Sequence, residues 1–97
     1  MQIISPAVAG TMESSDIMIR IEPGEGGVEL ALDSSVMRQF GKQIEAVIRS
    51  ALGELGVASA RVTAVDKGAL DCTVRARVMA AAYRGAGRED YTWEVKA

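Results

Sequence analysis

Two adjacent hydroxyl side chains lie between two carboxylates near the beginning of the chain. The run is Glu13, Ser14, Ser15 and Asp16, and an alternation of apolar residues follows it. Short polar side chains of this kind are typical of turns, because they hydrogen-bond to nearby backbone groups. We interpret Ser14 as an exposed hydroxyl that accepts a covalent modification, rather than as a nucleophile that the chain itself activates.

The composition excludes most forms of autonomous catalysis. The chain contains no histidine, so a Ser-His-Asp triad, a Cys-His pair and a histidine zinc site cannot be built. Cys72 is the single cysteine, which excludes an internal disulfide and favours a cytoplasmic protein. With 13 acidic and 11 basic residues, a broad nucleic-acid-binding surface is disfavoured. We expect no membrane partner, because no apolar run approaches the ~18 residues of a spanning helix.

The spacing of apolar residues predicts one domain over residues 1–97. Five segments have the composition or the period-two alternation of strands: residues 5–12, 17–22, 28–32, 61–66 and 70–78. The glycine-rich residues 23–27 lead into a strand rather than a helix and include Glu25. This segment therefore predicts a hairpin turn rather than a phosphate-binding loop.

One long amphipathic helix is predicted between the second and third clear strands. Residues 33–35 are Asp-Ser-Ser, all good N-caps. Apolar residues then recur at steps of three and four as far as Leu55, and Gly56 suits the position that ends a helix. Glu45 and Arg49 form a favourable pair four residues apart.

These elements predict a two-layer α+β fold. We expect the one helix to pack on a mostly antiparallel sheet of about four strands, in the order strand-strand-helix-strand-strand. The open face and edges of such a sheet would suit docking to larger subunits. Residues 79–83 are predicted to extend the last strand or to form a short helix. Residues 91–95, with Trp93, are expected to form a short final strand or a docked tail.

Three side chains on the predicted strand at residues 70–78 could carry chemistry. Cys72 falls on the apolar face of that strand, which favours a small core residue over a reactive thiol. Arg75 and Arg77 fall together on the polar face. Such a pair is usually solvated, but it could also grip a phosphate or the acidic groups of a partner.

Three blocks of sequence resemble the γ subunit of citrate lyase, which is the acyl carrier protein of that complex. They are Pro6–Thr11 with Glu13, Ser14, Asp16 and Met18–Ile21; Ser34–Val36 with Gln39–Gly41; and Asp66–Cys72. The blocks follow the family order and span about the first four-fifths of the chain. The last dozen or so residues match nothing distinctive.

The resemblance implies that Ser14 carries 2′-(5″-phosphoribosyl)-3′-dephospho-coenzyme A through a phosphodiester, attached by a dedicated transferase. Family members often have glycine after the modified serine; here Ser15 stands there and is the alternative site. The thiol of the group would carry acetyl and citryl groups between an acyltransferase (α) subunit and a lyase (β) subunit. The expected outcome is cleavage of citrate to acetate and oxaloacetate, with this chain as a non-catalytic carrier.

Other functions remain open at this stage. The carrier subunit of malonate decarboxylase uses the same kind of group, and a structural module that only assembles larger subunits would carry none. Asp33-Ser34 superficially matches the Asp-Ser of phosphopantetheine carriers. Those serines begin a helix of an all-helical bundle, whereas strands are predicted on both sides of this helix. We therefore assign Ser34 to capping.

Overall fold

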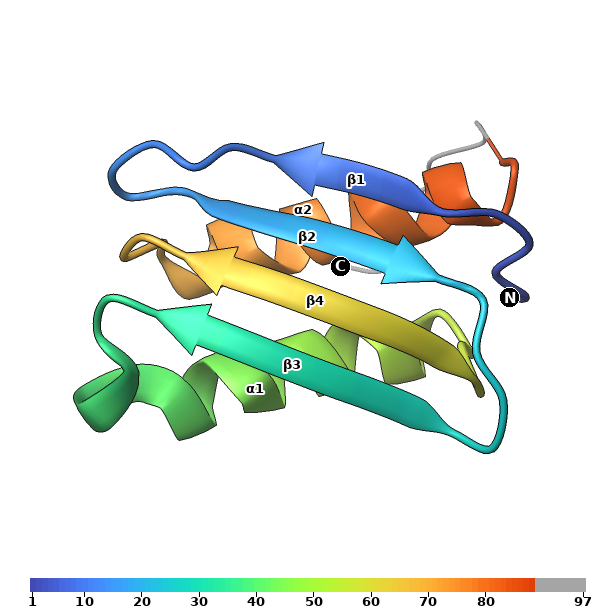
Figure 1. Cartoon of the computed structure of the whole chain (residues 1–97), viewed down its shortest axis with the longest axis horizontal. Helices are drawn as coiled ribbons and strands as arrows, with labels where there is room; N and C mark the ends of the chain where they lie inside the picture. The colour runs from blue at the N-terminus through green and yellow to red at the C-terminus, as the bar shows by residue number, and fades with distance from the viewer. Residues whose placement is uncertain (89–97) are drawn as a thin grey trace.

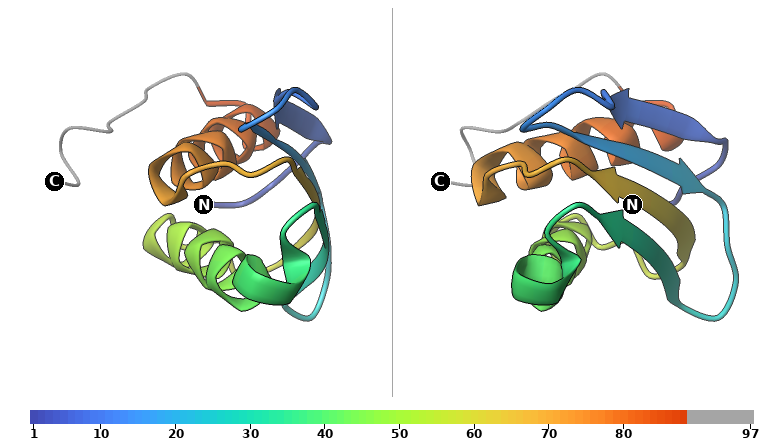
Figure 2. Two further views of the ribbon diagram at one scale, coloured as in Figure 1. Left: turned by 90° about the vertical axis from the view of Figure 1, so that its left-hand side faces the viewer. Right: turned by 60° about the vertical axis from the view of Figure 1, so that its left-hand side comes forward.

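The computed structural model describes residues 1–88 of the chain as one mixed sheet covered by two helices. The elements in chain order are β1 (Ala7–Gly10), β2 (Ile17–Glu22), β3 (Val28–Ser34), α1 (Met37–Glu54), β4 (Ala60–Asp66) and α2 (Asp71–Gly85). The strands are ordered β1-β2-β4-β3 across the sheet. Both helices lie on the same face of it (Figures 1 and 2).

The predicted α+β class and the two-layer arrangement are confirmed. The pairs β1–β2 and β2–β4 are antiparallel, and only β3–β4 is parallel. The sheet is therefore mostly antiparallel, as expected, and β1 is an edge strand.

The predicted strand at residues 70–78 is wrong, because the segment forms the first part of the helix α2. Its apolar residues fit both the period-two alternation of a strand and the three- and four-residue spacing of a helix. Val74, Val78, Ala81 and Ala82 are all buried, and their spacing of three and four residues is that of a helix face. The alanine-rich continuation favours a helix strongly. The period-two alternation ends at residue 78, whereas the helical spacing continues to the end of the helix.

The predicted hairpin between β2 and β3 is also wrong, because β4 lies between them. The glycine-rich segment 23–27 instead passes around the start of β4. A Cβ atom on Gly24 would lie 2.8 Å from the backbone carbon of Ala60, so only glycine fits this crossing. Gly27 accepts a backbone hydrogen bond from Ala60, 3.2 Å long. The α1 helix then makes the long crossover that a parallel β3–β4 pair requires.

The predicted start of α1 needs a correction at its N-terminus. Its N-cap residue is Val36, with no side-chain capping bond. Ser34 is the last residue of β3, and its Oγ donates to Asp66 Oδ2 at 2.8 Å and accepts from the Val36 amide at 3.1 Å. The predicted end is confirmed, because Gly56 follows the helix with a φ of +69°.

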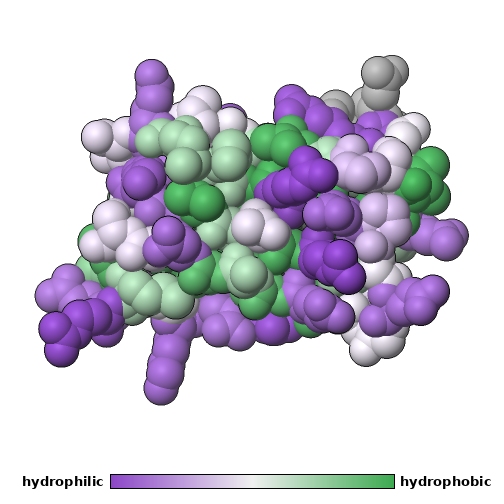
Figure 3. Space-filling view, viewed as in Figure 1, coloured by the Kyte–Doolittle hydropathy of each residue, from purple (hydrophilic) through white to green (hydrophobic). Residues whose placement is uncertain are grey.

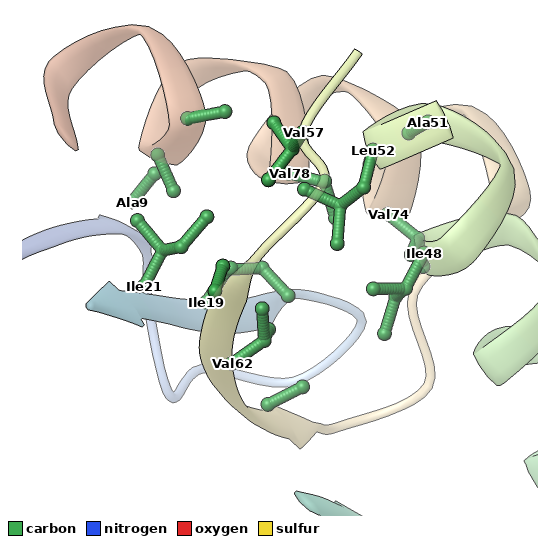
Figure 4. Packing of buried hydrophobic residues seen from close by; sticks show 14 of the residues in the cluster. Ala9, Ile19, Ile21, Ile48, Ala51, Leu52, Val57, Val62, Val74 and Val78 are labelled. Carbon is green, nitrogen blue, oxygen red and sulfur yellow. The ribbon is translucent and has the colours of Figure 1, made fainter. Parts of the chain in front are cut away.

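The core lies between the sheet and the two helices (Figure 4). Ile17, Ile19 and Ile21 of β2 are completely buried, as are Ile48 of α1 and Val74 of α2. Each such aliphatic side chain stabilises the fold by about 1.5–3 kcal/mol relative to exposure. The single element β2 thus anchors the turn that precedes it.

The opposite face of the sheet is covered by neither helix. On this face, apolar side chains gather to the left of the centre, and polar side chains lie around them and to the right of the centre (Figure 3). The register sets Met18, Val65 and Asp33 side by side across β2, β4 and β3. Within the described residues, neither helix is long and apolar enough to cross a membrane. The predictions for residues 91–95 and Trp93 lie outside the described residues.

Candidate functional site

The two hydroxyls of the sequence run lie in the connection between β1 and β2, here called the serine turn and defined as residues 11–16. It opens at one end of the sheet (Figure 1). Gly10 enters it with a φ of +95°. A Cβ atom on Gly10 would lie 1.8 Å from the carbonyl oxygen of Ile17. The two strands can therefore approach at the base of the turn only because residue 10 is glycine.

Asp16 organises the serine turn through four hydrogen bonds. Its Oδ2 accepts from Thr11 Oγ1 at 2.6 Å, and its Oδ1 accepts from the Ile17 amide at 2.7 Å. The Arg77 guanidinium on α2 donates to both oxygens, at 3.1 and 2.9 Å. Thr11 Oγ1 also accepts from the Glu13 amide at 3.2 Å. The turn is thereby bound to the second helix as well as to its own strands.

These bonds favour the charged form of the Asp16 carboxyl. The hydrogen bonds from Arg77, followed by the one from Thr11, lower the pKa of Asp16 from 3.8 to about 2. Its side chain is only 14% exposed. Asp16 is therefore a structural anion with a fixed partner, not a residue that exchanges protons near neutral pH.

Backbone bonds attach the turn to the connection between β4 and α2. The Ser15 amide donates to the Lys67 carbonyl and the Lys67 amide donates to the Asp16 carbonyl, both at 2.8 Å. Ser15 adopts a φ of +64°, which L-residues with a side chain rarely do. A glycine would occupy this position without strain.

Ser14 is exposed at the tip of this turn, together with Glu13 and Ser15. Ser34 is half-buried and bonded to Asp66, so it is a poor acceptor for modification. Ser14 and its neighbour Ser15 are both exposed, but their backbone conformations differ. Ser14 combines exposure with an ordinary backbone conformation, whereas its neighbour Ser15 has the strained one.

A second carboxylate, which is fully buried, holds the connections at this end of the sheet together. Asp66, at the end of β4, is 1% exposed. Its oxygens accept from the Gly68 and Ala69 amides, both at 3.0 Å, and from Ser34 Oγ. Its carbonyl accepts from the Ser35 amide at 3.1 Å. Gly68 has a φ of +93° in the tight turn that follows β4, and this turn leads into the helix α2.

An apolar groove of about 580 Å³ lies beside this turn, between the beginnings of the two helices. We call it the α1–α2 groove and define it by its lining residues: Val36, Phe40, Gln43, Ile44 and Gly68–Cys72. Phe40 and Leu70 are 47% and 71% exposed. The sequence placed Phe40 in the apolar stripe of the helix, but nothing in the sequence indicated that it would line a groove.

The three candidate side chains of residues 70–78 take different positions from those predicted. Cys72 is exposed in the α1–α2 groove, so its predicted burial is wrong. The helical period separates the two arginines that a strand would have placed together. Arg75 makes a two-pronged salt bridge with Glu54, one arm of which is 2.8 Å, and Arg77 binds Asp16. Sequence reasoning missed this role of Arg77; the helical spacing of α2 was the signal that could have revealed it.

The serine turn combines an exposed tip with an anchored base. Within residues 1–88, no three side chains of the types that bind metals come together. Ser14 has an accessible hydroxyl on a turn whose base is held by Asp16, Arg77 and Lys67. Such a turn fits a large covalent group, because the group can extend into solvent while the base stays in place.

Comparison with known proteins gives strong matches along the chain. Residues 4–85 match the family model described as ACP, malonate decarboxylase delta subunit (MdcD). The citrate lyase acyl carrier protein of Streptococcus equi subsp. equi is 57% identical over 95 residues, 97% of this chain and 93% of that protein. The protein of the same name from Latilactobacillus sakei subsp. sakei is 53% identical over 94 residues, with the same two coverages. Citrate lyase acyl carrier protein 2 of Salmonella paratyphi A is 54% identical over 94 residues, 96% of this chain and 97% of that one.

A solved structure has the same fold. It is a chain of the crystal structure of a Pseudomonas malonate decarboxylase hetero-tetramer in complex with malonate. The TM-score is 0.70, and the match covers 87% of this chain and 91% of that chain. At 19% sequence identity, this similarity concerns the fold.

Proposed function

Because this chain belongs to the family of citrate lyase acyl carrier proteins, we propose that it is the acyl carrier subunit of a citrate lyase, with Ser14 as its attachment residue. The observation that carries this proposal is the exposed Ser14 on a turn anchored at its base. The high identity to proteins of that name supports the choice of complex.

The group we propose on Ser14 is 2′-(5″-phosphoribosyl)-3′-dephospho-coenzyme A, joined through a phosphodiester. When bound, it supplies a terminal thiol that carries acetyl and citryl groups between the acyltransferase (α) and lyase (β) subunits, as citrate is cleaved to acetate and oxaloacetate. The chain itself supplies the hydroxyl oxygen of the attachment and holds the backbone around it. Tethering raises the effective concentration of the carried thiol at each partner site.

The surroundings of Ser14 favour modification by an external enzyme. Glu13 is exposed beside Ser14. Lys67 is also exposed, and its carbonyl accepts a hydrogen bond from the amide of Ser15, the residue after Ser14. We propose that Glu13 helps to steer basic docking surfaces of the transferase and of the large subunits. Asp16 is committed to Arg77 and serves the shape of the turn. The uncovered face of the sheet is available for docking to the larger subunits. A cytoplasmic location is part of the proposal.

A second candidate is the carrier subunit of malonate decarboxylase. It is favoured by the family model, which bears that description, and by the shared fold with a chain of the Pseudomonas complex. The acyl group on the thiol separates the two candidates. Acetyl and citryl groups support the citrate lyase carrier, whereas a malonyl group supports the alternative.

The proposal is tested by loading the recombinant protein with its dedicated transferase and measuring its intact mass. The wild type is expected to gain the mass of one group, and Ser14→Ala none. Ser15→Ala is the matched control, because it removes the adjacent exposed hydroxyl and leaves Ser14 in place. Normal loading of Ser14→Ala, with loss in Ser15→Ala, would move the site to Ser15. Loading of neither wild type nor variants would favour a structural assembly module.

A further inference from the structure

The α1–α2 groove has the size and chemistry of a site for an elongated, mostly apolar ligand. Its volume of about 580 Å³ lies within the range of about 300–1,000 Å³ typical of small-molecule sites. Phe40, Ile44 and Leu70 form apolar walls. The Gln43 amide donates to the Asp71 carboxylate at 2.9 Å, and this pair places polar atoms at one side of the groove.

Two of the apolar walls are exposed without an evident structural reason. Leu70 is 71% exposed although it immediately precedes α2, and Phe40 is 47% exposed although it belongs to the apolar stripe of α1. Together they leave an open apolar surface in the groove. The beginnings of α1 and α2, which border the groove, lie at the same end of the molecule as the serine turn (Figure 1). Such a surface costs free energy in water unless something covers it.

The groove and the serine turn are joined by a single short connection. The Ser15 amide bonds to the Lys67 carbonyl, and the next residue, Gly68, lines the groove. Gly68 has no side chain, and a Cβ atom built there would meet no atom within 4 Å. The space on the side-chain side of Gly68, between Lys67 and the groove, is therefore open.

We propose that the α1–α2 groove is the resting site of the pantetheine end of the covalent arm. This inference rests on the proposed function, because it requires a group on Ser14. The arm crosses the connection at Lys67 and Gly68, and its thiol end lies against Phe40 and Leu70. The carried thiol is thereby shielded from solvent between visits to the large subunits.

The chemistry of the arm matches the residues along this path. The phosphates nearest the attachment point are anionic, and exposed Lys67 stands beside the attachment turn. The pantetheine segment, which lies beyond the nucleoside and the pyrophosphate, combines aliphatic groups with a hydroxyl and two amides, which suits the walls and the Gln43–Asp71 pair. Because the arm is tethered next to the groove, its effective concentration there reaches the millimolar range without tight binding.

Cys72 provides a reporter inside the groove. It is exposed and lines the groove with Leu70 and Asp71. If the arm rests there, its thiol comes close to the Cys72 thiol. A mild oxidant such as diamide, which takes up the two hydrogens, should then close an intramolecular disulfide between them.

The test compares ring closure at two positions in protein whose loading has first been confirmed by intact mass. One is the wild type, with Cys72 in the groove. The other is the double variant Cys72→Ser, Asp33→Cys, whose cysteine lies on the uncovered face of the sheet, about 10 Å or two strand spacings from Met18. We expect closure with Cys72 to be at least about ten-fold faster, after correction for the reactivity of each cysteine toward a free disulfide. Equal rates would overturn the proposal.

The result remains interpretable if the proposed function fails. Absence of the group in the first mass measurement contradicts the proposed function, whereas loading followed by equal closure rates contradicts only the resting site. The variant Leu70→Ser gives a second, independent test. Leu70 is already exposed, so its replacement should not affect folding. We expect the arm thiol of that variant to react several-fold faster with an external disulfide reagent, and an unchanged rate would count against the site.

Other occupants of the groove give distinct results. NMR signals of Phe40 and Ile44 should shift when the full chain is loaded, at every protein concentration. Shifts that depend on concentration would assign the groove to a second copy of the chain. Signals that ignore loading but change when residues 89–97 are removed would assign it to that segment. Either result would overturn the proposal.

Discussion

At the scale of single residues, Ser15 occupies a position that suits glycine. Its φ of +64° places it in the left-handed region, which costs a residue with a side chain about 1 kcal/mol. We predict that Ser15→Gly raises the free energy of unfolding by up to about 1 kcal/mol and leaves loading at Ser14 intact. Urea unfolding and intact mass measure the two effects.

The control for this prediction is Ser15→Val, which puts a β-branched side chain in the same backbone conformation. It should lower the free energy of unfolding by about 1–2 kcal/mol. A Ser15→Gly variant that is less stable than the wild type would contradict the strain argument. Loss of loading in that variant would place a necessary hydroxyl at Ser15 instead of Ser14.

The lowered pKa of Asp16 predicts how the free energy of unfolding depends on pH in the acidic range. Because hydrogen bonds from Arg77 and Thr11 lower its pKa from 3.8 to about 2, its contribution is complete above pH 3.8 and is lost as the pH falls toward 2. With allowance for screening at partly exposed Arg77, that contribution is about 1–2 kcal/mol. We predict that Asp16→Asn is less stable by this amount at pH 7 and loses this part of the acid dependence.

Urea unfolding at several pH values between 2 and 7 measures this effect. Asp33→Asn is the matched control, because Asp33 is an exposed carboxylate on the uncovered face of the sheet. Its stability should stay within about 0.5 kcal/mol of the wild type. An Asp16→Asn variant with the full acid dependence of the wild type would show that another carboxylate is responsible.

At the scale of elements, the serine turn depends on how closely β1 and β2 approach. Gly10 combines a φ of +95° with a backbone contact that a Cβ atom would violate, at 1.8 Å from the Ile17 carbonyl oxygen. We predict that Gly10→Ala lowers the free energy of unfolding by more than about 2 kcal/mol and slows loading at Ser14, because the base of the turn must open.

Gly26 gives a matched control for Gly10. It also has a positive φ, +74°, but a Cβ atom there would meet nothing within 4 Å. Gly26→Ala should therefore cost only about 1 kcal/mol and leave loading unchanged. Similar losses in the two variants, measured by urea unfolding, would show that backbone strain alone matters and that the close contact does not.

The elements that the sequence predicted well are those with one clear period. The isoleucines of β2 alternate cleanly, and the apolar stripe of α1 continues to a glycine stop. The first half of the segment that forms α2 fits both the strand period and the helix period. The residues that follow therefore decide whether it forms a strand or a helix. Placing it in a strand also misplaced Cys72 and Arg77, because both depend on which face each residue occupies.

Pairing between strands depends on packing that no short window of sequence contains. The glycine-rich segment 23–27 has the composition of a hairpin, yet the chain places β4 between β2 and β3. This arrangement lets α1 cross over to a parallel neighbour and puts both helices on one face. The α1–α2 groove follows from that topology, which is why it was absent from the sequence-based hypothesis.

At the scale of the whole molecule, the fold brings three connections to one end of the sheet. The serine turn, the β3–α1 connection and the β4–α2 connection meet there through Asp16, Asp66 and Lys67. The hydrogen bonds that join them span long stretches of sequence, 32 residues for Ser34–Asp66 and 61 for Asp16–Arg77. Ser14 was predicted from local turn chemistry and family resemblance, but its supports come from distant parts of the chain.

In this arrangement, one part of the molecule holds the serine turn in place and another part exposes Ser14. The buried isoleucines of β2 and the two helices hold the base of the turn, while the tip with Ser14 remains exposed. A carrier needs this combination, because its partners must reach the attachment point without unfolding the domain. Removing the Ser14 hydroxyl should accordingly leave the melting temperature of Ser14→Ala equal to that of the wild type.

The most direct test is peptide mapping of the protein purified from its own cells as part of an active complex. Trypsin releases residues 1–20, which contain Ser14, separately from residues 21–38, which contain Ser34. We predict that the mass of one phosphoribosyl-dephospho-coenzyme A group lies on the first peptide and that fragmentation places it on Ser14. An unmodified first peptide from a fully active complex would contradict the account.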